Sequence, residues 1–156
     1  MARYLLDTNV LVYSVDERES EAPKRARAVD VLARVGRPGP SGPSGPSGAL
    51  PAQALAEFSR VAMGRLRPPV PADDVYRQVG LYERAFPVYP LTPAVVLEAV
   101  RGVRDHGFPY YDAQVWAAAK LNQVPVVLSE DFASGSTVEG VTFVDPFGEG
   151  FDVEGL

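Results

Sequence analysis

Short apolar runs alternate along this chain with longer segments in which apolar residues recur every three or four positions, the spacing of one helix face. The short runs predict buried strands at Arg3–Leu6, Val124–Ser129 and Val141–Val144, and a shorter strand at Val88 and Tyr89. The helical spacing predicts helices over Val10–Val15, Ala22–Val35, Pro51–Met63, Asp73–Phe86, Pro93–His106 and Tyr111–Asn122. Such alternation is typical of an α/β fold, so we expect a central parallel sheet flanked by helices on both faces.

The length and composition fit one compact domain. With 156 residues, of which 46% are hydrophobic, the chain can bury a core, and we expect one domain over residues 1–156. Three Gly-Pro-Ser repeats at Gly39–Ser47 predict a loop inside that domain, and Gly148–Leu156 forms an acidic tail. No apolar run is long enough to span a bilayer, and Asp7 and Asn9 interrupt the apolar N-terminal stretch, so we expect a cytoplasmic protein. The absence of cysteine excludes disulfides, thiolate metal sites and cysteine nucleophiles.

The net charge bears on which partners the chain can bind. It is −5 at pH 7, whereas a protein that binds nucleic acid by charge alone is usually basic. Either the acids gather at a metal site, where a bound divalent cation reverses the local charge, or the acidity argues against a nucleic-acid partner. Basic clusters at Lys24–Arg27 and Arg60–Arg67 fit either phosphate contacts or a solvated surface.

Two acidic residues stand at the ends of predicted strands. Asp7 ends the first strand, and Asp131 lies just after the strand that closes at Ser129. Parallel α/β sheets form ligand sites at the carboxyl ends of their strands. Asp112 lies in the first turn of one predicted helix, and Glu57 lies within another. Each acid taken singly also fits a structural role in a helix cap or a turn, so position alone leaves both interpretations open.

A series of motifs, in a fixed order, resembles those of a PIN-domain nuclease. The motifs are LLDTNVLVY at Leu5–Tyr13, QALAEF at Gln53–Phe58, YYDAQVWAAA at Tyr110–Ala119, VVLSEDF at Val126–Phe132 and DPF at Asp145–Phe147. Their order and spacing agree over nearly the whole chain, and the sequence is most similar to the VapC toxins of bacterial toxin–antitoxin pairs. There are two departures: the Gly-Pro-Ser loop is outside the family pattern, and Asp145 stands where asparagine is more usual.

The resemblance implies a single PIN-like domain in which four acids converge on Mg²⁺ or Mn²⁺ and act as catalytic residues. These acids are Asp7, Glu57, Asp112 and Asp131. The resemblance also implies endonucleolytic hydrolysis of RNA, homodimerisation and inhibition by a small protein antitoxin. The ligand chemistry agrees, because carboxylate oxygens suit Mg²⁺ and Mn²⁺, and such an ion can activate water for attack on a phosphodiester.

The polar and aromatic residues next to the four acids in the sequence each fit either a functional or a structural role. Thr8, Asn9 and Ser129 could orient the acids or metal-bound water, and capping or turn chemistry explains them equally well. Tyr110 and Tyr111 fit either stacking on RNA bases or packing in the core.

Other functional classes are distinguished by single positions. RNA cleavage by a pair of histidines is excluded within one chain, because His106 is the only histidine and stands at a predicted helix end. A metal-dependent phosphatase usually has a second aspartate two residues after its nucleophile, where this chain has Asn9. A catalytically silent PIN-like module that binds RNA or protein is the main alternative to a nuclease.

Overall fold

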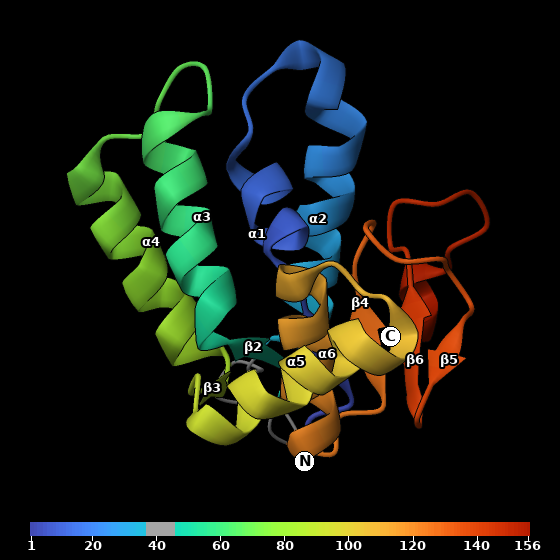
Figure 1. Ribbon diagram of the computed structural model, residues 1–156. Coiled ribbons are helices and arrows are strands. Elements are labelled where there is room, and N and C mark those ends of the chain that lie inside the picture. The colour runs from blue at the N-terminus through green and yellow to red at the C-terminus, as the bar shows by residue number, and fades with distance from the viewer. Residues whose placement is uncertain (37–45) are drawn as a thin grey trace.

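A central sheet with helices on both faces forms the molecule (Figure 1). The computed structural model describes residues 1–36 and 46–156, and within them the strand order is β3-β2-β1-β4-β6-β5. The strands are β1 (Tyr4–Leu6), β2 (Gly48–Pro51), β3 (Val88–Tyr89), β4 (Val126–Leu128), β5 (Thr137–Val138) and β6 (Val141–Val144). Neighbouring strands are parallel apart from the antiparallel pair β5 and β6. The predicted α/β fold with a largely parallel sheet is therefore confirmed.

The helices divide between the two faces of the sheet. They are α1 (Thr8–Val15), α2 (Ala22–Val35), α3 (Ala52–Gly64), α4 (Ala72–Ala85), α5 (Pro93–His106) and α6 (Tyr110–Leu121), with short 3₁₀ turns at Glu19–Glu21 and Val153–Gly155. Successive side chains of a strand point to opposite faces. Accordingly, Tyr4 and Leu6 of β1 lie in the core under α1 to α4, whereas Leu5 lies in the core under α5 and α6. Each face therefore has its own hydrophobic core.

Helix ends follow the signals in the sequence. Thr92 caps α5, its Oγ1 accepting from the Val95 N–H at 3.2 Å, and Pro93 occupies the first turn. Gly107 ends the same helix with a φ of 70°, which glycine adopts without steric cost. The helix predicted from Val10 begins earlier, at Thr8, so it starts directly after Asp7.

Two strands were not expected from the sequence. The apolar part of β2 is only Ala49 and Leu50, which is too short to give a strand pattern. In addition, Pro51, the last residue of β2, was assigned to the predicted helix that follows. A Cβ on Gly48 would lie 2.8 Å from Val35 Cγ2, so the close packing of α2 on β2 favours glycine there. β5 pairs through a tight turn with β6, and β4 is shorter than the predicted Val124–Ser129.

The predicted loop and the tail have different outcomes. Most of Gly39–Ser47 lies outside the described residues, so the loop stays a prediction, although the Ser47 carbonyl accepts from the Arg3 and Tyr4 amides. In the acidic tail, Phe151 and Leu156 pack against the core, and Glu154 pairs with Arg34 at 2.6 Å. Within residues 1–36 and 46–156, no helix has the length and apolar character needed to cross a membrane.

Candidate active site

Asp7 stands where β1 ends and α1 begins. Because β1 and β4 are parallel neighbours, their carboxyl ends meet at one edge of the sheet. The Asp7 N–H donates to the carbonyl of Leu128, the last residue of β4, at 3.1 Å. Asp7 Oδ1 accepts from the Thr8 N–H at 2.7 Å and so caps α1. The side chain is only 4% exposed, so the fold holds an acidic group in a place that water hardly reaches.

Ser129 links the ends of β1 and β4 through its side chain. Its Oγ donates to Asp7 Oδ2 at 2.7 Å and accepts from the Asp131 N–H at 3.1 Å. Asn9 Nδ2 donates to Ser129 Oγ at 3.1 Å and to Asp131 Oδ2 at 3.2 Å. These bonds hold the two aspartates that follow β1 and β4 in a fixed relation, with Ser129 completely buried between them.

A third aspartate joins them from the first turn of α6. One carboxylate oxygen from each of Asp7, Asp112 and Asp131 lies within 4.8 Å of the others. We call these three residues the acidic centre. Asp7 is buried, Asp112 is partly buried and Asp131 is exposed, so the centre extends from the sheet edge to the solvent. The structure thus brings together three of the four acids that the sequence motifs single out.

Glu57, the fourth acid, lies beside the centre but outside this group of three. Its Oε2 accepts from Thr8 Oγ1 at 3.1 Å, and its Oε1 accepts from Gln53 Nε2 at 2.8 Å. Its negative charge nevertheless raises the pKa of Asp112 and of Asp131. Glu57 therefore belongs to the same electrostatic environment, and hydrogen bonds from α1 and α3 fix its orientation.

The pKa values of the acidic centre are raised. Burial is the main cause for Asp7, whose pKa rises from 3.8 to about 7 despite hydrogen bonds from Ser129 and Thr8. Burial, followed by the charges of Asp131 and Glu57, raises the pKa of Asp112 to about 6. Burial also raises the pKa of Asp131. In the part of the chain that the structure describes, no lysine, arginine or histidine forms an ion pair with these acids.

A further unsatisfied group lies next to the centre. Asn9 Oδ1 is buried and has no hydrogen-bond partner among the described residues, although its Nδ2 donates to Ser129 and Asp131. Buried polar oxygens are nearly always paired, so an unpaired one next to clustered carboxylates indicates a missing donor or cation. The donor set consists of oxygens, which Mg²⁺ and Mn²⁺ prefer. The residues of the centre therefore fit a hard divalent cation.

Two glutamines that were not predicted from the sequence as site residues hold Glu57 and the start of α6 in place. Gln53 Nε2 donates to Glu57 Oε1 and to the Tyr111 carbonyl at 3.3 Å, and Gln53 Oε1 accepts from Gln114 Nε2. Gln53 precedes Glu57 by four residues, one helical turn, and that spacing could have identified it. Gln114 offered no such signal, because only the packing of α6 against α3 brings it near.

A second group of missed residues holds the segment after β4. Tyr13 Oη donates to Glu130 Oε1 at 2.6 Å, and Lys24 Nζ donates to Glu130 Oε2 at 3.0 Å. Glu130 thus anchors the turn that carries Asp131 to α1 and α2. The Glu130 carboxylate forms an ion pair with Lys24 and does not belong to the acidic centre.

The strand order makes this an α/β protein. Its acidic centre lies at the carboxyl ends of parallel strands and offers the carboxylate oxygens that divalent cations prefer. A family model described as the PIN domain matches residues 4–133, which include all four predicted acids. The chain belongs to the PIN domain family, which confirms the resemblance seen in the motifs. No protein of curated function matches the chain in sequence.

Solved structures share this fold at low sequence identity. A toxin–antitoxin complex from Klebsiella pneumoniae matches with a TM-score of 0.62 and 17% identity, covering 92% of this chain and 97% of that one. Mycobacterium tuberculosis VapC20, described as a sarcin–ricin loop cleaving toxin, matches with a TM-score of 0.63 and 15% identity, covering 87% and 97%. DNA-bound VapBC from Salmonella typhimurium matches with a TM-score of 0.58 and 16% identity, covering 94% and 99%. At these identities the likeness establishes a common fold.

Proposed function

We propose that this protein is a metal-dependent endoribonuclease that acts as the toxin of a toxin–antitoxin pair. One observation carries the proposal: three carboxylates gather within 4.8 Å at the carboxyl edge of the sheet, without a protein cation among the described residues. Such an arrangement is unfavourable for the protein alone and is explained by a bound cation. Membership of the PIN domain family supports a nuclease.

Similar structures support the finer assignment. VapC20 of Mycobacterium tuberculosis is a toxin that cleaves the sarcin–ricin loop, and the matches from Klebsiella pneumoniae and Salmonella typhimurium are toxin–antitoxin assemblies. By this likeness we propose RNA as the substrate and a small protein antitoxin as the partner, in the cytoplasm.

We propose Asp7, Asp112 and Asp131 as the residues that hold Mg²⁺ or Mn²⁺. When bound, such an ion would stabilise the charge that develops on the phosphate and lower the pKa of a bound water. The contribution of the chain is to fix the ligands before the ion arrives. Both oxygens of Asp7 are hydrogen bonded, one by the Thr8 amide and the other by Ser129. Such support of metal ligands typically affects activity 10–100-fold.

Glu57 and Asn9 have proposed roles around the ligands. Glu57 lies outside the group of three, and hydrogen bonds from Thr8 and Gln53 hold its carboxylate as an acceptor. We propose that it accepts a proton from the attacking water. The unpaired Asn9 Oδ1 would accept a hydrogen bond from water at the centre.

Cleavage of labelled cellular RNA by the wild type and Asp112→Asn, each in Mg²⁺ and in EDTA, tests the proposal. Asp112 forms no hydrogen bond through its carboxylate with the described residues, so the amide changes charge with little loss of structure. We expect cleavage only in Mg²⁺, and a loss beyond about 100-fold in Asp112→Asn, more than is typical for supporting residues. Asp105→Asn on α5 is the matched control and should cleave like the wild type.

Two outcomes would contradict the proposal in different ways. Undiminished cleavage in excess EDTA would exclude the metal-dependent chemistry. RNA binding without cleavage in Mg²⁺ or Mn²⁺ would support the silent PIN-like module, and hydrolysis of a small phosphate ester alone would support the phosphatase.

We also propose a homodimer, which rests on the family likeness and on exposed apolar side chains of α5. Leu97 is 73% exposed and Val100 is 54% exposed, and the two lie three residues apart on α5, so they fall on one face of the helix. We expect sedimentation equilibrium at micromolar concentration to give twice the chain mass of 16.8 kDa. A mass equal to one chain would contradict the dimer.

A further inference from the structure

A pocket of about 720 Å³ lies next to the acidic centre, between α3 and α6. Glu57 lines this pocket, and its charge raises the pKa of Asp112, so the pocket adjoins the acidic centre rather than lying on a separate surface. Its volume is typical of pockets that hold small organic groups. The residues of the α3–α6 pocket that carry the argument are Gln53, Glu57, Arg60, Tyr110, Tyr111 and Gln114.

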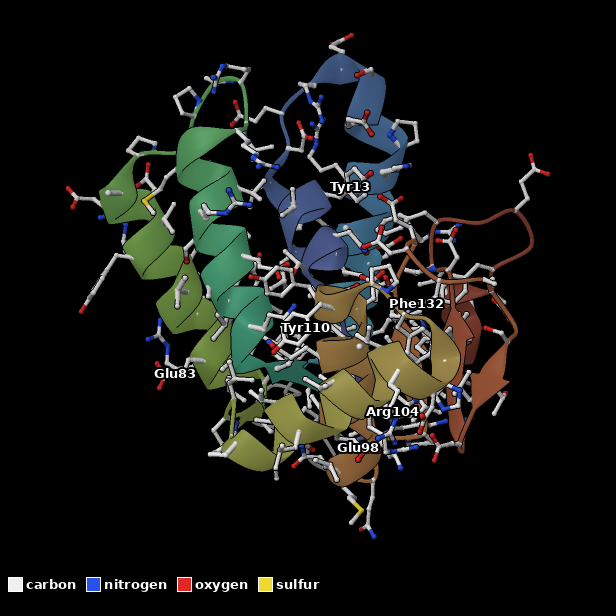
Figure 2. The ribbon with its side chains drawn as sticks, viewed as in Figure 1. Tyr13, Glu83, Glu98, Arg104, Tyr110 and Phe132 are labelled. Atoms are coloured by element: carbon white, nitrogen blue, oxygen red, sulfur yellow. The ribbon has the colours of Figure 1, made fainter. Side chains whose placement is uncertain are left out.

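Two neighbouring tyrosines at the start of α6 form one wall. Tyr110 is 38% exposed and Tyr111 is 64% exposed, and their rings meet edge to face with centroids 5.3 Å apart. Figure 2 shows Tyr110 between α3 and α6. Neither hydroxyl forms a hydrogen bond with any described residue. Core packing therefore does not account for the pair, and Tyr111, which precedes Asp112 in the chain, is the more exposed of the two.

The polar wall of the pocket contains two carboxamides, and they differ in how many of their hydrogen-bonding groups are already in use. Gln53 donates to Glu57 and to the Tyr111 carbonyl, and its oxygen accepts from Gln114. Gln114 uses only that one N–H, and with the described residues its oxygen accepts nothing. A carboxamide with a free donor and a free acceptor matches the hydrogen-bonding edge of a nucleobase.

Arg60 adds a positive charge at the rim. It follows Glu57 by three residues on α3, and its guanidinium forms no ion pair or hydrogen bond with the described residues. Most other arginines in the described part of the chain pair with acids or donate to carbonyls, such as Arg18, Arg27 and Arg101. A guanidinium that has no partner among the described residues, in the lining of a pocket next to the acidic centre, suits the phosphate of a bound nucleic acid.

We propose that the α3–α6 pocket holds an unpaired nucleobase of single-stranded RNA, next to the phosphate that lies at the acidic centre. The base stacks on Tyr111, its edge meets Gln114, and Arg60 binds a neighbouring phosphate. Because a base inside a duplex cannot reach such a pocket, the substrates are RNA loops or single strands. This inference rests on the proposed nuclease function, but a binding measurement can test it separately.

The test is a double-mutant cycle that measures the coupling in binding free energy between the Tyr111 ring and one RNA base. Labelled single-stranded RNA decamers, each with a different single position made abasic, are titrated with protein in EDTA, and Kd is measured by fluorescence anisotropy. The proteins are the wild type, Tyr111→Leu, Tyr111→Phe, Arg60→Met and the control Tyr76→Leu, whose tyrosine is 83% exposed on α4. The same RNAs are then cleaved in Mg²⁺.

Stacking of one base on one ring is worth about tenfold in affinity. We therefore expect one abasic position to weaken wild-type binding about tenfold, and to weaken Tyr111→Leu binding less than about twofold. Tyr111→Phe keeps the ring and should behave like the wild type, as should Tyr76→Leu. In Arg60→Met, binding should weaken for all the RNAs alike, with a shallower salt dependence.

The outcomes separate the pocket from the nuclease. If each abasic position weakens binding by the same factor in the wild type and in Tyr111→Leu, the pocket inference is overturned, whatever the cleavage result. The same holds if no RNA binds. If the expected coupling appears but no RNA is cleaved, the pocket stands and the nuclease proposal fails.

Discussion

Two groups of carboxylates in this molecule meet opposite electrostatic environments. The acidic centre has no protein cation among the described residues, and burial raises the pKa of Asp7 to about 7. The second group, which we call the ion-pair cluster, joins α5, α6 and the β5–β6 turn. Its members are Glu98, Arg101, Arg104, Asp105, His106, Lys120 and Glu139.

In the ion-pair cluster the protein itself supplies the positive charge. Glu139 Oε2 lies 2.7 Å from Arg101 Nη2 and 2.6 Å from His106 Nε2. Hydrogen bonds from His106 and then Arg101 lower the pKa of Glu139 to about 2. Arg101 and Lys120 likewise lower the pKa of Glu98, which Figure 2 labels on α5.

The difference shows that acidity alone does not define the candidate site. An acid cluster that contains its own cations is structurally complete. A cluster with raised pKa values, next to an Asn9 oxygen that has no partner among the described residues, is not. The position in the fold explains the contrast. Strand ends and helix starts point backbone N–H groups and short side chains at the acidic centre, whereas the exposed face of α5 has room for long basic side chains.

The first prediction concerns metal, and it should give the largest change in stability. An ion that binds only the folded protein stabilises it by about 2.7 kcal/mol at a hundredfold excess over Kd. We expect thermal melts to show such a gain for the wild type and for Glu139→Gln on adding Mg²⁺ or Mn²⁺ to EDTA-treated protein. Asp112→Asn should lose most of the gain. An equal gain in all three proteins would show that the ion binds elsewhere.

The second prediction concerns the cost of the acidic centre without metal. The folded pKa of Asp112 is raised from 3.8 to about 6, so its stabilising contribution is complete below pH 3.8 and is lost as the pH rises through 6. In EDTA at pH 8, Asp112→Asn should therefore be more stable than the wild type, by about 1–2 kcal/mol after allowing for solvent screening. The gain should disappear near pH 4. Urea unfolding at both pH values measures it.

The contrary result would assign Asp112 a structural role. Loss of a helix-cap or turn acid costs about 1 kcal/mol with or without metal. If Asp112→Asn is less stable than the wild type in EDTA and gains as much from Mg²⁺, the site assignment is wrong. Asp7→Asn is a poorer probe, because Asp7 Oδ2 accepts from Ser129 and an amide nitrogen there could not.

The sequence predicts a residue's place in the acidic centre or the ion-pair cluster only where neighbouring residues in the chain form a recognisable pattern. Asp7 and Asp131 follow apolar runs, and the rule for parallel sheets predicts that they lie at one edge. Asp112 and Glu57 sit on helices whose docking no local pattern reveals, so their place in the site came from the family motifs. The separation of Glu57 from the other three depends on hydrogen bonds from Thr8 and Gln53, which only the packed structure brings into range.

The ion-pair cluster was less visible still. Arg101 lies on a predicted helix, but its partner Glu139 lies 38 positions further along the chain, in a turn beside an unpredicted strand. The helix-end prediction for His106 is confirmed by the end of α5, whereas its contact with Glu139 was not foreseen. Long-range pairings of surface charges leave no period in the sequence.

The last prediction concerns the ion-pair cluster and should give the smallest change. Because the folded pKa of Glu139 is lowered from 4.5 to about 2, its stabilising contribution is present above pH 4.5 and is lost as the pH falls through 2. Glu139→Gln should thus lower the melting temperature slightly at pH 7 and less at pH 3. Salt screens pairs this exposed, so 1 M NaCl should also shrink the difference, while RNA cleavage stays within about twofold of the wild type. Melts at both pH values and both salt concentrations measure the effect. A drop that persists at pH 3 and in 1 M NaCl would mean that Glu139 acts through packing, and the contrast between the two carboxylate groups would then not rest on paired charge.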